Sequence, residues 1–263
     1  MGYFGSSAFA GIKAGSSDVT KIYVGSTLAW SAAPAATDPN FSSVQLLLHG
    51  EGADAGTTIV DSSSNAFSPS ALTNVTTSTT QFKYGSASLR FNAGVAEYAN
   101  NAAFYPAGGD FTWEAFVRFD TKTFNGLFVL GDSVAAGFGV NFTYEFYFHN
   151  TSNTLRFVYS TDGTNITTKS YPFTPTANTW YHIAAVRSGT DMGVFVDGTL
   201  LSTSAISGTF FNNTTAPYRL GCIRGDGVDV YQLTGYMDEV RFTKGIARYT
   251  GNFTPPTAAF PDS

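Results

Sequence analysis

Hydrophobic and polar residues alternate over many short stretches of this chain. The clearest stretch is FTWEAFVRF, residues 111–119, in which every second residue from Phe111 to Phe119 is apolar. In an extended strand, alternate side chains point to the same side. The pattern therefore predicts a strand whose apolar face, made by Phe111, Trp113, Ala115, Val117 and Phe119, covers a core.

Comparable stretches follow one another at intervals of about 10–15 residues, a spacing typical of β-sandwiches. We expect strands at residues 44–49, 87–91, 126–130, 144–148, 154–159, 180–187, 193–196, 218–223 and 233–242. Few windows repeat with the period of a helix. The sequence thus predicts an all-β fold, a two-layer antiparallel jelly-roll β-sandwich over residues 41–250, and a C-terminal surface tail over residues 251–263.

Alternation within residues 233–242 makes a specific prediction about two neighbouring carboxylates. It assigns Tyr236, Asp238, Val240 and Phe242 to one face and Met237, Glu239, Arg241 and Thr243 to the other. On this pattern Asp238 and Glu239 point in opposite directions.

Residues 1–30 differ from the rest and precede a Pro/Ala-rich linker, residues 31–40. KIYVGSTLAW, residues 21–30, reads as a hairpin with a turn at Gly25-Ser26. A hairpin this short cannot bury a core, so its apolar residues are expected to dock on another protein or on copies of the chain, for instance as a trimer. The predicted attachment residues are Ile22, Tyr23, Val24, Leu28 and Trp30.

Composition narrows the classes of partner. Aromatic residues make up 16% of the chain and charged residues 13%, and the formal net charge is −5. Without a cluster of lysines and arginines, a nucleic-acid groove is not expected. No apolar run approaches the ~20 residues that cross a bilayer, so we expect no membrane insertion, and the N-terminus does not read as a signal peptide.

Two blocks carry a family resemblance. They are TWYHIAAVRSGTDMGVFVDGTLL, residues 179–201, and LTGYMDEVRFTKGIARYTGNFTPP, residues 233–256. Together they resemble the concanavalin A-like lectin/glucanase superfamily, and within it the laminin-G-like and pentraxin-like jelly rolls. The second block looks like the form common in tail and surface proteins of bacteriophages, and KIYVGSTLAW is similar to segments at the head of phage structural proteins.

This resemblance implies a bacteriophage virion structural protein, made in the host cytoplasm and placed on the virion surface. Its role would be capsid decoration or fibre-like adhesion, with other virion proteins bound through the N-terminal segment and a host-surface glycan as a further partner. The alternatives are a secreted non-catalytic carbohydrate-binding module and, with less support, a glycoside hydrolase.

Catalysis has no positive signal in the sequence. A glycosidase needs two carboxylates on one side of the scissile bond, roughly 5 Å apart in a retaining enzyme. The glucanase pattern, Glu-X-Asp-X-X-Glu, does not occur. With Asp238 and Glu239 expected on opposite faces, we predict a protein that is not an enzyme and has no catalytic residue.

The resemblance also implies a site for one cofactor, a structural calcium ion. In laminin-G-like relatives an acidic loop after the first strand meets an acidic residue of the last strand. Here that correspondence selects Glu51, Asp61 and Asp238. Calcium prefers several carboxylate and carbonyl oxygens. Solvated or hydrogen-bonded loop carboxylates are the alternative, and the low density of acidic residues favours it.

Carbohydrate binding calls for an exposed aromatic ring against the C–H face of a sugar, with amides and carboxylates for its hydroxyl groups. Such residue types gather around residues 141–150 and in the loop 224–231. The candidates are Tyr144, Asn150, Asp226, Asp229 and Tyr231. Most aromatic side chains in a chain this rich in them will be buried, so burial is the alternative for each ring.

Overall fold

The computed structural model describes residues 37–131, 141–225 and 228–263, and the strand residues 13–14, 17–18, 21–24 and 27–31. Contacts between Cα atoms divide the chain into two compact units, Met1–Thr37 and Asp38–Ser263. No helix in the described part of the chain has the length and apolarity needed to cross a membrane.

The N-terminal unit contains a hairpin where the sequence predicted one. Strand β3 (Lys21–Val24) pairs antiparallel with β4 (Thr27–Ser31), and Ile22 lies opposite Trp30. A two-residue pair, β1 (Lys13–Ala14) and β2 (Ser17–Asp18), precedes it. The five predicted attachment residues lie on β3 and β4, and their role in attachment stays a prediction.

The second unit is built almost entirely of antiparallel strands. After the short 3-10 turn η1 (Phe41–Ser43), its strands begin with β5 (Val44–Leu48), β6 (Ala71–Ser78) and β7 (Ser88–Tyr98). A second 3-10 turn, η2 (Ala102–Phe104), leads to β8 (Phe111–Phe119), β9 (Asn125–Gly131), β10 (Phe142–His149), β11 (Thr154–Ser160) and β12 (Ile166–Pro172). The remaining strands are β13 (Trp180–Ser188), β14 (Asp191–Val196), β15 (Thr199–Ala205), β16 (Tyr218–Leu220), β17 (Ile223–Gly225), β18 (Val228–Val230) and β19 (Leu233–Lys244).

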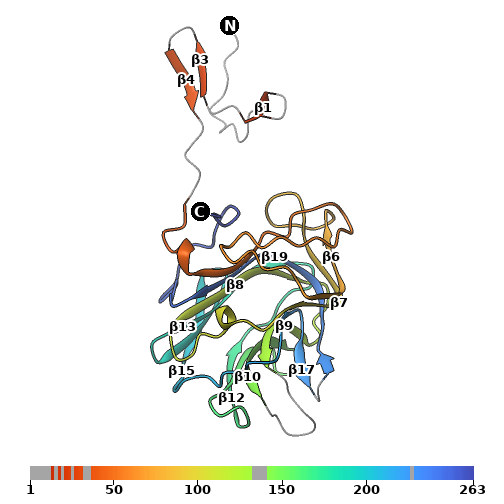
Figure 1. The fold of residues 1–263 in the computed structure, drawn as a ribbon, viewed down its shortest axis with the longest axis vertical. Coiled ribbons are helices and arrows are strands. Elements are labelled where there is room, and N and C mark those ends of the chain that lie inside the picture. Colours follow the sequence, from red (N-terminus) through yellow and green to blue (C-terminus); the bar gives the residue numbers. More distant parts are fainter. Residues whose placement is uncertain are drawn as a thin grey trace. The chain divides into compact units, whose positions relative to one another are not determined.

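Thirteen strands form one folded-over sheet with two layers (Figure 1). Its order is β12-β11-β10-β9-β16-β7-β19-β8-β13-β14-β15, with β5 beside β19 and β6 beside β7. Strand β7 joins the layers, because its first part pairs with β19 and its last three residues pair with β16. The edge strands β12 and β15 approach each other, and the Tyr171 hydroxyl of β12 donates to the Met192 carbonyl of β14 at 2.9 Å. The predicted jelly-roll sandwich is confirmed.

Aromatic rings fill the space between the layers. The Trp113 indole is fully buried, with its ring centre 4.7 Å from that of Phe128 and 5.9 Å from that of Phe146. All five residues of the predicted inner face of 111–119 belong to this core. Layers of large planar side chains pack at the spacing of facing sheets, which explains the high aromatic content.

The C-terminal strap, residues 245–263, follows β19 and covers part of the outer face of the β8 layer. Phe260 is 4% exposed, and its N–H donates to the Glu239 carboxylate at 2.7 Å. The rings of Tyr249 and Phe253 stack 3.5 Å apart. Residues 251–263, expected as a surface tail, are therefore anchored by a buried side chain and a buried hydrogen bond.

Asp38 belongs to the same outer layer. Its carboxylate contacts Arg241 at 3.1 Å and Arg248 at 2.6 Å, and it is 7% exposed. The last residues of the predicted linker 31–40 are thus part of the jelly-roll unit.

Candidate functional site

Four aromatic side chains meet at one end of the sandwich, and we call them the aromatic lip: Phe124, Tyr147, His149 and Tyr231. Tyr231 stacks on Phe124 with ring centres 4.3 Å apart, and His149 meets Phe124 edge-on at 4.4 Å. Tyr147 lies 6.2 Å from His149. Tyr231 is 44% exposed although its ring is supported from behind, so the lip presents an aromatic face to solvent.

Local backbone geometry holds Tyr231 in this place. Its φ of 51° is left-handed, a conformation uncommon for a bulky residue, and its carbonyl accepts from the Gly126 N–H at 2.6 Å. A Cβ on Gly126 would come within 2.1 Å of the Cys222 carbonyl carbon. Glycine at this position therefore lets the β17–β18 segment lie directly on β9 and carry Tyr231 to the lip.

Polar groups surround the lip. The Ser152 hydroxyl lies 2.9 Å from His149 Nδ1, and Arg156 Nη2 donates to the same hydroxyl at 3.2 Å. Burial and the nearby Arg156 lower the pKa of His149, so its ring is neutral near pH 7. Asn150, directly after His149, is partly exposed. The lip can offer a ring face together with amide, hydroxyl and guanidinium groups.

The sequence-predicted sugar residues divide into three groups. Tyr231 and Asn150 lie at the lip. Asp229, on β18, is ion-paired with Arg224 at 2.8 Å and lies 3.5 Å from Arg219. Asp226 lies outside the described residues.

The prediction that the Tyr144 ring stacks against a sugar was wrong. It is 1% exposed, and its hydroxyl donates to the Phe104 carbonyl at 2.5 Å inside the core. Its ring points between the layers because Tyr144, Phe146 and Phe148 alternate on the inner face of β10. Tyr147 and His149, on the opposite face of this strand, are its residues that reach the lip.

Sequence reasoning missed Phe124 and His149 as lip residues. Phe124 follows a polar loop and has no pattern around it, while His149 lies within the stretch 141–150 expected to hold sugar-binding residue types but was not among the named candidates. Phe124 and His149 come together because β9 pairs with β10, with Asn125 opposite Phe148, and the hydrogen bond from the Gly126 N–H to the Tyr231 carbonyl holds Tyr231 beside them.

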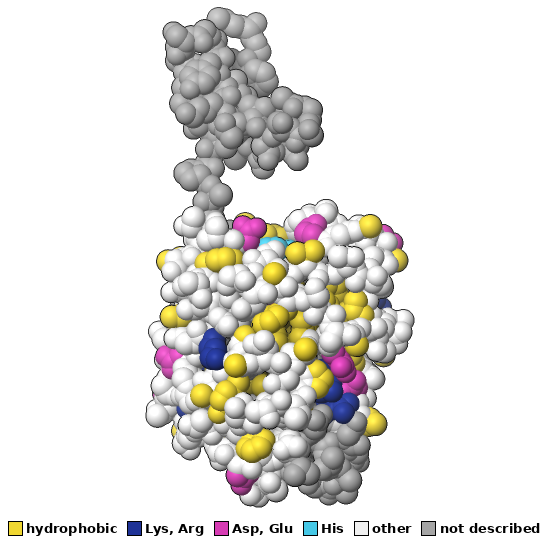
Figure 2. All heavy atoms as spheres, viewed as in Figure 1, with side chains coloured by type: hydrophobic (Ala, Val, Ile, Leu, Met, Phe, Trp, Pro, Cys, Tyr) yellow, Lys and Arg dark blue, Asp and Glu magenta, His cyan; other side chains and the backbone are white. Residues whose placement is uncertain are grey.

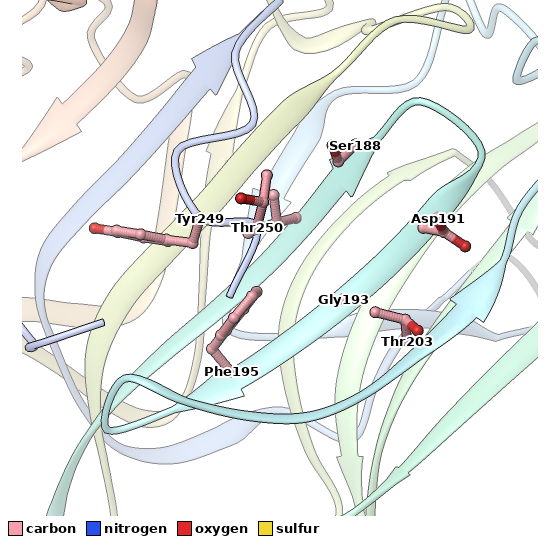
Figure 3. Close-up of a pocket in the computed structure, with 8 residues that line it drawn as sticks. Ser188, Asp191, Gly193, Phe195, Thr203, Tyr249 and Thr250 are labelled. Carbon is pink, nitrogen blue, oxygen red and sulfur yellow. The ribbon is translucent and has the colours of Figure 1, made fainter. Parts of the chain in front are cut away.

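A pocket of about 200 Å³ lies elsewhere, between β13, β14, β15 and the start of the C-terminal strap (Figure 3). Its lining residues are Val186, Ser188, Asp191, Gly193, Phe195, Thr203, Tyr249 and Thr250. The volume is below the roughly 300–1,000 Å³ of pockets for drug-sized ligands. Four hydroxyl-bearing side chains, one of them the phenol of Tyr249, and one carboxylate suit a small polar group.

A family model described as the concanavalin A-like lectin/glucanases superfamily matches residues 92–246. The chain belongs to this superfamily. No curated protein matches the chain.

Solved structures with the same fold include several bacterial binding domains. The binding domain of Paraclostridial Mosquitocidal Protein 1 has a TM-score of 0.57 at 14% identity, covering 84% of this chain and 50% of that one. The binding domain of botulinum neurotoxin serotype D/C has a TM-score of 0.54 at 12% identity, covering 84% and 50%. The chain thus spans about half the length of these toxin domains.

A third structure is matched over nearly its whole length. Domain 4 of AbnA, an extracellular arabinanase from Geobacillus stearothermophilus solved with arabinotriose, has a TM-score of 0.56 at 13% identity. The match covers 82% of this chain and 96% of that domain. At these identities the likeness establishes the fold.

The calcium set expected by analogy with laminin-G-like members of the superfamily is not assembled. Glu51 accepts from the Ser86 N–H and hydroxyl at 2.9 and 2.6 Å. Asp238 accepts from the N–H groups of Lys83 and Tyr84 at 2.6 and 3.1 Å. Donors of the loop around residues 83–86 thus occupy both oxygens of Glu51 and Oδ2 of Asp238.

Asp61 is engaged separately. Its carboxylate accepts from the N–H groups of Leu47, Ser63 and Phe67, each at 2.9 Å, and so fastens the opening loop to β5. Within the described ranges, no group of three or more His, Cys, Asp or Glu side chains is placed to hold a metal ion. The three carboxylates act as hydrogen-bonded loop anchors.

The prediction that Tyr236 and Asp238 share a face of β19 with Val240 and Phe242 was wrong. Met237 lies in the core with Val240 and Phe242, whereas Tyr236 and Asp238 lie on the outer face. The cause is a bulge between Asp238 and Arg241, where Glu239 has a φ of 53°. The extra residue turns both carboxylates outward, although the alternation predicted that they oppose each other.

Neither carboxylate is available to a substrate in this arrangement. Asp238 is fully buried and Glu239 is 1% exposed. Glu239 binds His49 Nδ1 at 2.9 Å, and this hydrogen bond raises the pKa of His49. Burial raises the pKa of Asp238 to about 7, against the two N–H groups that favour its charged form.

Proposed function

We propose that this protein is a non-catalytic, lectin-like adhesion or decoration protein of a bacteriophage virion, which contacts host-surface carbohydrate through the aromatic lip. The observation that carries the proposal is the exposed Tyr231 ring, supported by Phe124 and bordered by hydrogen-bonding side chains. A supported ring loses little conformational freedom when a sugar stacks on it. Membership of a superfamily that includes lectins supports the same role.

The first test compares glycan binding by Tyr231→Ala and the unchanged protein on an array of bacterial surface polysaccharides that also carries arabinotriose. Losing the ring contact should weaken binding about tenfold or more, as expected for an aromatic surface of this size. Phe82→Ala is the matched control, because Phe82 is 42% exposed and lies outside the lip.

Binding that survives Tyr231→Ala would count against the lip. Loss of binding in Thr203→Arg, which fills the mouth of the pocket in Figure 3, would place the sugar there instead. Thr203 is exposed on the edge strand β15, so the larger side chain should be tolerated.

Attachment to the virion is assigned to the N-terminal unit, through Ile22, Tyr23, Val24, Leu28 and Trp30. The likeness of residues 21–30 to phage segments supports this, together with a hairpin too small for a core. Such a hairpin exposes strand edges that can pair with other virion proteins or with copies of the chain.

A chain that begins at Thr37 should remain folded but fail to enter the particle or oligomer. It retains Asp38 and therefore the contacts with Arg241 and Arg248. Incorporation can be measured by protein content of purified particles, and size by analytical ultracentrifugation. Normal incorporation of the shortened chain would transfer attachment to the jelly roll.

A secreted carbohydrate-binding module is the second candidate. The near-complete match to a domain of an extracellular arabinanase favours it. Particle purification separates the two proposals, since only a virion protein copurifies with assembled phage.

A further inference from the structure

Four planar side chains form a row across the outer face of neighbouring strands, and we call it the arginine–aromatic row: Arg90, Tyr236, Arg118 and Trp180. Tyr236 of β19 pairs with Arg90 of β7 on one side and with Arg118 of β8 on the other. Trp180 of β13 pairs with Arg118. Directly paired residues share a face, so the four side chains lie next to one another.

The contacts within the row are stacking contacts. The guanidinium carbon of Arg90 lies 4.6 Å from the Tyr236 ring centre, and that of Arg118 lies 5.4 Å from it. Trp180 lies 6.3 Å from Tyr236. These distances are within the range of cation–π and aromatic contacts, which fixes the planes of the guanidinium groups.

Both arginines share a single carboxylate. Asp120 binds Arg90 through one oxygen and Arg118 at 2.6 Å through the other. No second ion pair links either arginine to a carboxylate in the part of the chain that the structure describes. One positive charge is left over, in a protein whose formal net charge is −5.

The arginine–aromatic row also lies beside the part of the sheet that Tyr84 and the C-terminal strap cover, and not beneath them. The adjacent row on the same face, Phe116 and His182, is covered by Tyr84 at 5.2 Å and by Phe253 and Phe260 of the strap. The side chains of Arg90 and Arg118 keep 24% and 12% of their surface exposed, and Trp180 is partly exposed. Guanidinium donors and an indole therefore face solvent together.

We infer that the arginine–aromatic row binds the anionic group of an acidic saccharide, with the sugar ring against Trp180. Preorganised guanidinium groups recognise carboxylate and sulfate oxygens in a planar geometry that lysine does not offer. The inference rests on the proposed glycan-binding function and adds a second contact region and a ligand class. Asp120 keeps both arginines in place while the excess charge attracts the ligand.

Figure 2 shows one face of the jelly-roll unit, on which charged side chains are few, with acidic and basic side chains side by side at the lower right. Because charged residues make up only 13% of the chain, few other charges compete with an unbalanced arginine pair for an anionic ligand. Screening by salt should weaken the interaction, as for any partly exposed charge.

The test uses the full chain and an array of uronate, sialylated and sulfated oligosaccharides, each beside its neutral parent. The unchanged protein should bind at least one acidic member about tenfold more tightly than that parent. Arg90→Gln should reduce this preference, while Lys122→Gln removes a nearby exposed charge without touching the row and should preserve it.

Tryptophan emission reports the location. Addition of the bound acidic saccharide should change the emission of the unchanged protein but not that of Trp180→Phe. Arg90→Lys, which keeps the charge and loses the planar fork, should behave like Arg90→Gln.

Equal binding of acidic and neutral members overturns the inference and leaves the proposed lectin-like function standing. An acidic preference that Arg90→Gln does not reduce also overturns it. Competition by inorganic phosphate as strong as by the saccharide shows a simple anion site and removes the sugar from the inference. Binding to no glycan at all overturns both proposals.

Discussion

Replacing Glu114 by glutamine should lower the free energy of unfolding by about 3–5 kcal/mol. Glu114 is fully buried on β8 under the C-terminal strap. Its carboxylate binds Arg241 at 2.8 Å and His182 at 3.1 Å, and it accepts from the Tyr249 hydroxyl at 2.8 Å. Glutamine would leave the buried Arg241 with only Asp38 as a carboxylate partner.

The pKa of Glu114 also shows that its interactions with Arg241 and His182 outweigh the cost of burying its charge. Burial alone would raise it, but Arg241 and His182 outweigh burial and hold the pKa at about 2. Because this value lies below the ordinary one, the stabilisation is complete above about pH 4.5 and is lost as the pH falls toward 2. The replacement should therefore cost most near neutral pH and little in acid.

Urea denaturation at pH 7 measures the effect. Glu97→Gln is the matched control, because Glu97 pairs with Arg219 at 3.0 Å but keeps 27% of its side chain exposed. A partly exposed pair of this kind should contribute about 1 kcal/mol or less. Equal losses in the two variants would show that the network around Glu114 is not a special source of stability.

Alternation predicted the layers of this fold well because one buried face repeats along each strand. Residues 111–119 show this directly, since each alternate residue is in the core. The same rule fails at β19, where the bulge at Glu239 shifts the alternation by one residue. A bulge is decided by long-range pairing, and its trace in the sequence is only the spacing of three between the core residues Met237 and Val240.

The packing of the C-terminal strap also could not be predicted from the local sequence. Residues 251–263 are rich in proline and polar residues and read as a tail, yet Phe260 is buried among Val44 and Leu47. Phe253, which stacks on Tyr249, and the hydrogen bond from the Phe260 N–H to Glu239 hold the segment as well. Such a segment is recognisable only once the surface beneath it is known.

The candidate site was predicted in part. Of the residues expected to bind sugar, Tyr231 and Asn150 lie at the aromatic lip, whereas Tyr144 faces the core; Phe124 was not recognised. Composition indicates which groups a site needs, whereas exposure depends on strand phase and on the neighbour that supports each ring. Both come from pairing between distant strands.

Wild-type stability should fall as the pH rises from about 4.5 to about 8, and Glu145→Gln should remove roughly half of that fall, because Asp238 also holds a proton in the folded state. Glu145 lies on β10 at 3% exposure, and its Oε2 has no hydrogen-bond partner among the described residues. Burial raises its pKa to about 8. The folded protein therefore holds a proton that the unfolded chain releases above about pH 4.5.

The sign follows from proton counts. Between these pH values the folded state binds one proton more at Glu145, so each rise in pH favours unfolding, by a total on the order of 4 kcal/mol. Glutamine carries no such proton, so the free energy of unfolding of the variant should match that of the wild type near pH 4.5 and exceed it near pH 8.5.

Urea denaturation across this range, with Asp238→Asn for comparison, identifies the group responsible. The pKa of Asp238 is about 7, so its replacement should remove a fall that ends one pH unit earlier. A Glu145→Gln protein that still loses the same stability by pH 8.5 would show that Glu145 is already ionised in the folded state.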